Sequence, residues 1–246
     1  MIGLANLTIV EAKMVWRDPL GLVLPLGLPG LIMVMNGVGA DRTGVPDFGG
    51  MPALDAFVVP LTLVMILGMI GMLNLPSFLA TYRRTGVLRR LAVTPAHPAM
   101  VLTAQVLVSL VQALIGLAAA LAIAFVAFDI AAPNNVVGAV AVLGLAVCAL
   151  YALGMLIAAV APTTNAAIAI GVVLFFVTMA LGGGFGPAEN LPTWLATIGE
   201  HAPFGAALAA LSDSWAGSTP QWQHLAALGA TTVVSVVAAA KLFRWD

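Results

Sequence analysis

The three histidines are the side chains best suited to proton transfer, and none has the surroundings of a catalytic group. His97, His201 and His224 lie in expected loops or at the ends of apolar segments, with no serine or cysteine nucleophile in a recognisable motif nearby. His201 follows Glu200, and a solvated pair is the simpler interpretation of that adjacency. The sequence therefore predicts no catalytic residues.

Nucleotide hydrolysis and metal binding lack the residues that they need. A phosphate-binding loop requires the pattern Gly-x-x-x-x-Gly-Lys-Ser/Thr, and neither lysine, Lys13 or Lys241, lies in one. No cluster of histidine and cysteine has metal-ligand spacing. We expect no enzyme activity, no metal and no cofactor in this chain itself.

Positive charge is concentrated in one short segment, 82–95, within a chain that is 62% hydrophobic and 8% charged. A soluble domain is about 25% charged, so this much apolar surface indicates a protein whose solvent is lipid. The segment holds four of the nine lysines and arginines, namely Arg83, Arg84, Arg89 and Arg90. Such a loop predicts which side of the membrane it occupies.

Six apolar stretches are long enough to cross a bilayer, which takes about 20 helical residues. They cover about 20–38, 56–79, 99–128, 136–160, 165–184 and 223–243. With the N-terminus in the cytoplasm, eight of the nine cations face inward and Arg42 alone faces outward. We expect an all-α integral membrane protein with one transmembrane domain over 1–246, in the cell membrane, with both termini cytoplasmic.

Residues 1–18 are predicted to form an interfacial helix before the first span. Asn6, Lys13 and Arg17 fall within an arc of about 40° on a helical wheel, and the segment ends on Trp16 and Arg17. A frayed tail is the alternative interpretation.

The middle of every predicted span lacks Asp, Glu, Lys, Arg and His. Carriers driven by ions usually have an ionisable group there, so the sequence argues against a proton-coupled pump. Gln105, Ser109 and Gln112 share one face of the third span. They could form a weakly polar wall of a substrate path, or they could join helices through hydrogen bonds.

The segment 185–222 contains apolar stretches too short to span, interrupted by prolines. Short outer re-entrant helices before the last span are therefore expected. The residues singled out in this segment are Phe185, Pro187, Glu189, Pro192, Trp194 and Pro203.

Two motifs resemble those of the type-2 ABC exporter permeases. The inner loop is similar to that family's E-x-x-x-G-T-L-x-x-L-x-x-T-P loop, and the outer segment is similar to G-x-F-x-P-x-E-x-L-P-x-W-L followed by proline. The matching loop residues are Thr85, Gly86, Val87, Leu88, Arg89, Arg90, Leu91, Thr94 and Pro95. Tyr82 stands where the family often has an acidic residue.

The resemblance implies the permease subunit of an exporter for a hydrophobic or amphipathic compound, such as a drug, an antibiotic or a lipid. ATP and Mg would be bound by a separate ATPase subunit. Segment 1–18 would be the elbow helix, loop 80–98 the coupling helix, and segment 185–222 a cap on the exit path. A second permease, identical or related, would complete the transporter.

The loop residues fit that role. Val87, Leu88 and Leu91 fall within an arc of about 100°, so they can enter a groove while the arginines pair with acidic groups or anionic lipid. Two other functions stay open at this point. A channel or secondary carrier would need no ATPase, and a scaffold or sensor subunit would move no compound.

Overall fold

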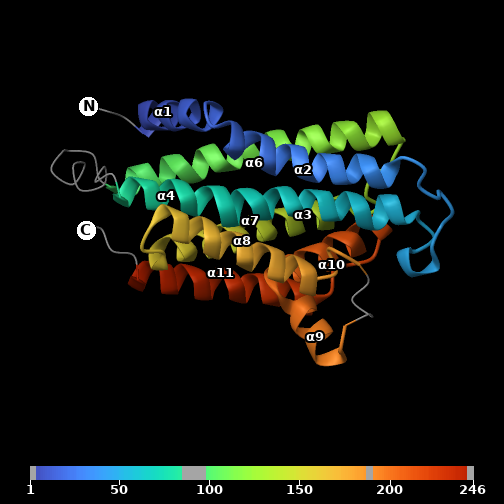
Figure 1. Ribbon diagram of the computed structural model, residues 1–246. Helices are drawn as coiled ribbons and strands as arrows, with labels where there is room; N and C mark the ends of the chain where they lie inside the picture. The colour runs from blue at the N-terminus through green and yellow to red at the C-terminus, as the bar shows by residue number, and fades with distance from the viewer. Residues whose placement is uncertain (1–3, 85–97, 187–190, 243–246) are drawn as a thin grey trace.

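The computed structural model describes residues 4–84, 98–186 and 191–242, which form a helical bundle without strands (Figure 1). The predicted all-α integral membrane architecture is confirmed. The α-helices are α1 (Leu4–Trp16), α2 (Pro19–Gly37), α3 (Val59–Met69), α4 (Leu75–Arg84), α6 (Pro98–Phe128), α7 (Val136–Val160), α8 (Thr164–Leu181), α9 (Thr193–His201), α10 (Pro203–Ala216) and α11 (Trp222–Leu242). A 3-10 turn, η1 (Pro46–Phe48), and two π-helical segments, η2 (Leu54–Val58) and η3 (Ile70–Asn74), complete the described elements.

Five helices of the described chain are long and apolar enough to cross a membrane. They are Leu54–Tyr82, Met100–Phe128, Val136–Val160, Thr164–Leu181 and Trp222–Leu242, close to five of the six predicted spans. The remaining predicted span, 20–38, is α2. It follows α1 after a bend of 61°, and this bent pair brings the number of candidate spans to six.

Charge separates the two ends of the bundle. The basic end carries α1, the end of α4 and the end of α11, and both chain termini point to it in Figure 1. The acidic end carries the loop after α2, the start of α7, and helices α9 and α10 (Figure 1). Lys13, Arg17, Arg84 and Lys241 are at the basic end, and Arg42, Asp55 and Asp213 are at the acidic end.

The helix Leu54–Tyr82 is the centre of the bundle. In its most apolar stretch 83% of the residues are buried, against 17–39% for the other four spans. Every residue of α3 is buried. The two π-helical segments, η2 and η3, interrupt its regular α-helical hydrogen bonding, and such segments often lie at functional positions.

Glycines let two neighbouring helices reach the backbone of this central helix at η3. A methyl group added at Gly154 on α7 would lie 1.8 Å from the carbonyl oxygen of Gly71. One added at Gly171 on α8 would lie 2.2 Å from the carbonyl oxygen of Met72. Helices pack this closely in lipid only where small residues meet. The central helix is therefore held between α7 and α8 through its π-helical segment.

An ion pair holds the other end of the central helix. Arg42 Nη1 lies 3.0 Å from Asp55 Oδ1, and Asp55 Oδ2 accepts a hydrogen bond of 2.9 Å from the backbone of Ala131. Arg42 also donates to the carbonyl oxygens of Phe128 and Asp129 at the end of α6. One carboxylate thus joins the loop after α2, the central helix and the connection from α6 to α7.

Two short helices, α9 and α10, precede the last span. Helix α8 ends at Leu181, and Gly182, Gly199 and Gly205 then bring α8, α9 and α10 into direct backbone contact. Helix α10 returns into the bundle and packs on α3, α7 and α11. It buries the apolar side chains Phe204, Leu208, Leu211 and Trp215.

We predict that Gly154→Ala lowers the free energy of unfolding by about 1–3 kcal/mol, because the new methyl group must displace the backbone of η3. Gly144→Ala is the matched control, since it is on the same helix with nothing within 4 Å of the added carbon. Thermal unfolding in detergent measures both variants. Equal melting temperatures for the two would contradict the close packing at η3.

We also predict that Asp55→Asn destabilises the protein by about 1–3 kcal/mol, because Arg42 loses its buried carboxylate partner. The control is Asp129→Asn, an exposed carboxylate on the same connection whose left-handed backbone (φ 47) asparagine tolerates. Urea-induced unfolding in detergent should separate the two variants. Similar midpoints would show that the ion pair contributes no net stability.

Candidate functional site

Helix α1 and the central helix meet at the basic end through a buried hydrogen bond. The hydroxyl of Tyr82 donates to Glu11 Oε2, and both side chains are buried. The same hydroxyl lies 3.8 Å from the sulfur of Met14. Because Tyr82 stands two residues before the end of α4, this bond attaches α1 to the segment that leads into the predicted coupling loop.

Only the first part of the predicted coupling site falls in the described structure. Arg83 and Arg84 are the last two residues of α4, and Arg84 is exposed. The chain returns at Pro98, the first residue of α6, at the same end of the bundle. Outside the described residues are Thr85, Gly86, Val87, Leu88, Arg89, Arg90, Leu91, Thr94 and Pro95.

The predicted elbow segment forms α1, and it shows an apolar outer face. Ile9, Val10 and Trp16 are exposed, as is Lys13 on the same helix. Arg17 follows the helix and is also exposed. The inner face packs on the first part of α6, beside which α1 lies in Figure 1.

The polar face of α6 points into the bundle. Gln105, Ser109 and Gln112 are all buried. Gln112 Nε2 donates to the carbonyl oxygen of Gly21 over 2.6 Å, and the hydroxyl of Tyr151 donates to the Ser109 carbonyl over 2.8 Å. Neither amide atom of Gln105 has a hydrogen-bond partner among the described residues. In this conformation the face therefore joins α6 to α2 and α7.

The carbonyl of Gly21 is available because of a proline. In an α-helix this oxygen would accept from the residue four positions on, which is Pro25 and has no N–H. Asn74 Nδ2 and Gln112 Nε2 both donate to it at 2.6 Å. In lipid an unsatisfied backbone carbonyl is costly, so this junction of α2, η3 and α6 compensates for the helix break.

The predicted outer segment is only partly described. Phe185 is exposed and stacks on Phe176 with ring centroids 6.2 Å apart. Pro192 is the N-cap of α9, Trp194 is exposed on its first turn, and Pro203 begins α10. The other two singled-out positions, Pro187 and Glu189, are outside the described residues.

One expectation about this segment is wrong. Glu200 does not pair with its neighbour His201 but with His224 on α11, with Glu200 Oε1 3.0 Å from His224 Nε2. His201 Nδ1 is 2.9 Å from the carbonyl oxygen of Thr197 instead. Successive residues of a helix face different directions, so adjacency in sequence was a poor guide.

Two features went unnoticed in the sequence. The Glu11–Tyr82 bond joins residues 71 positions apart, and no pattern within one helix predicts such a pair. Asp213 and His224 line a shared cavity at the acidic end. These residues come from separate helices, so their spacing in the sequence does not predict that they line one cavity.

Comparison with known families shows the family to which the chain belongs. No curated protein matched the chain at the significance required. The family described as ABC-2 type transporter matches residues 4–214, which include α1, the loop between α4 and α6, and most of the re-entrant segment. The match covers far more than half of the 246 residues. The chain therefore belongs to the ABC-2 type transporter family and is a multi-pass ABC permease.

Proposed function

We propose that this permease is the membrane subunit of an exporter that moves a hydrophobic or amphipathic compound, driven by a separate ATPase subunit. The observation that carries the proposal is the family match over residues 4–214. ATP and Mg²⁺ are bound by the partner, and this chain supplies the path through the membrane. Two permease copies, or this chain and a related one, form the transporter.

The distribution of charge supports a cytoplasmic basic end. Five cations of the described chain, Lys13, Arg17, Arg83, Arg84 and Lys241, are at the end to which both termini point, whereas Arg42 at the acidic end is paired with Asp55. Cytoplasmic loops of membrane proteins carry an excess of Lys and Arg. This orientation puts the coupling loop in reach of a cytoplasmic ATPase and α9 and α10 on the outer side of the cell membrane.

The contacts at the basic end support a path for force. ATP binding draws two ATPase subunits together, and the apolar strip of Val87, Leu88 and Leu91 follows the groove in which it is seated. The loop continues directly from α4, so its movement reaches the central helix. The Tyr82–Glu11 bond carries part of the same movement to α1, whose apolar outer face lies in the membrane interface.

The remaining predicted sites have supporting roles. Exposed apolar residues of α6 and α8, among them Leu114, Ile115 and Val173, face lipid or the second permease. The path of the compound follows the Gln105, Ser109 and Gln112 face when the helices separate. The segment from Phe185 to Pro203 closes its outer end.

The coupling assignment is tested by changing Leu88 and Leu91 to Asp in the co-expressed complex. Two carboxylates in the apolar strip should reduce co-purification of the ATPase at least about tenfold, because burying unpaired charge is costly. Matched controls are Val38→Asp and Val136→Asp together, which are exposed positions at the acidic end. Unchanged ATPase recovery with the Leu88/Leu91 variant, at normal membrane levels, would reject seating in a groove.

A second variant tests the link to α1. Tyr82→Phe should destabilise the protein by about 1–3 kcal/mol, because Glu11 stays buried without its donor. Adding Glu11→Leu removes the unpaired buried carboxylate and should restore much of the lost stability. A double-mutant cycle on the melting temperatures measures the interaction energy between residues 11 and 82. Additive effects of the two changes would show that the bond is energetically unimportant.

A further inference from the structure

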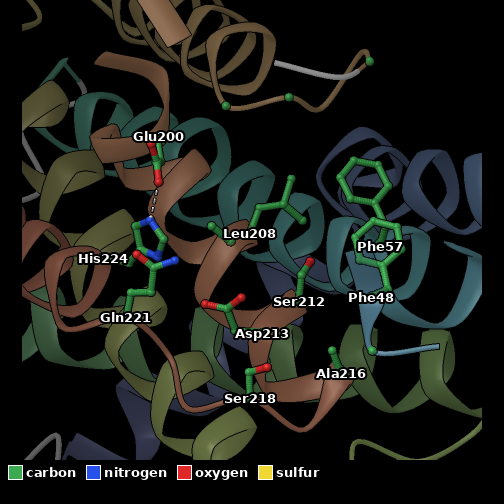
Figure 2. A pocket seen from close by; sticks show the side chains of 15 residues that line it. Phe48, Phe57, Glu200, Leu208, Ser212, Asp213, Ala216, Ser218, Gln221 and His224 are labelled. Carbon is green, nitrogen blue, oxygen red and sulfur yellow. Dashed lines mark hydrogen bonds and ion pairs between the residues drawn. The ribbon is translucent and has the colours of Figure 1, made fainter. Parts of the chain in front are cut away.

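A polar cavity lies at the acidic end, where η1, η2, the end of α8, α9, α10 and the start of α11 meet. Its volume is about 330 Å³, which is within the range of small-molecule sites. Glu200, His224 and Asp213 lie toward one side, Phe48 and Phe57 stand on the other, and Ser212 lies between Asp213 and the two rings (Figure 2). No role in the proposed coupling or in the α6 face involves these residues.

Three buried polar atoms of this cavity have no hydrogen-bond partner among the described residues. They are Ser212 Oγ, Asp213 Oδ2 and His224 Nδ1. The side chain of His224 is only 2% exposed, and its other nitrogen, Nε2, is held by Glu200. Buried polar atoms are almost always paired with protein groups, water or a ligand, so these three atoms at one cavity have hydrogen-bonding capacity that the described residues leave unused.

Acidic side chains outnumber basic ones in the lining of the cavity. Two carboxylates, Glu200 and Asp213, face one imidazole, and the lining includes no lysine or arginine. Burial raises the pKa of Asp213, and the nearby His224 opposes that rise. An anion is therefore disfavoured here, whereas a cation relieves both the negative charge and the cost of burying the carboxylate.

The shape of the cavity favours an organic cation over a metal ion. No group of three His, Cys, Asp or Glu side chains among the described residues is arranged to hold a metal. On the apolar side, Phe48 and Phe57 stack with centroids 6.3 Å apart, and Leu208 lines the wall beside them. Aromatic faces attract cations and also bury the apolar part of an amphipathic ligand.

We propose that this cavity binds a protonated organic amine, with the ammonium group between Asp213 and Ser212 and the apolar part against Phe48 and Phe57. An ammonium carries three N–H donors, and Asp213 Oδ2 and Ser212 Oγ are acceptors for two of them. That such amines are the exported compounds rests on the proposed function, whereas binding itself requires no ATPase.

The test uses the full chain in lipid nanodiscs without an ATPase, with 4-fluorophenethylammonium as the probe and fluorine NMR as the readout. The control compound is 2-(4-fluorophenyl)ethanol, which has nearly the same shape but no charge. Binding of the ammonium should be saturable and at least about tenfold tighter than that of the alcohol, because a charged donor meets a partly desolvated carboxylate. Equal affinity for the two, or no saturable binding of the ammonium, would overturn the proposal.

Variants locate the site. Asp213→Asn should weaken ammonium binding at least about tenfold, and Asp41→Asn, an exposed carboxylate at the same end, should leave it unchanged. Ala209→Leu fills the cavity while keeping every charge, so it should abolish binding even if Asp213→Asn does not fold. Full binding by folded Asp213→Asn or by Ala209→Leu contradicts the assignment. If the chain binds the ammonium but no ATPase co-purifies with it from cells, the proposed function is contradicted and the binding site is not.

Discussion

The rest of the bundle depends on the anchoring of its central helix, Leu54–Tyr82. Asp55 holds one end through Arg42, and Tyr82 holds the other through Glu11. Between them α7 and α8 touch its backbone through Gly154 and Gly171. In lipid there is little hydrophobic force between helices, so polar contacts and close packing of small residues must fix this helix. The central helix is thus held at both ends by polar contacts and in the middle by backbone contact with α7 and α8.

This arrangement connects structure with the proposed mechanism. In the proposed mechanism a separate ATPase subunit supplies the energy for transport. In that proposal, residues 85–97, which follow α4 directly in the sequence, pass the movement of the ATPase to the central helix. The π-helical segments η2 and η3 are irregular points of this helix, and such segments often lie at functional positions.

The sequence predicted the spans well because apolar length and charge placement are local properties. It predicted five spans to within a few residues in most places, the helix at the N-terminus, and short helices such as α10 before the last span. Contacts between distant residues could not be predicted in this way. The Glu200–His224 pair, the donors to Gly21 and the cavity around Asp213 depend on how helices pack, which periodicity in one segment does not encode.

The central claim is that force reaches this permease through the loop between α4 and α6, and site-specific photo-crosslinking tests it directly. A photoreactive benzoylphenylalanine in place of Val87, in cells expressing the native operon, is predicted to yield an adduct with an ATP-binding subunit. The same group in place of Val126, an exposed residue near the other end of α6, is predicted to yield none. Adducts of position 87 with lipid or with the permease alone would contradict the account.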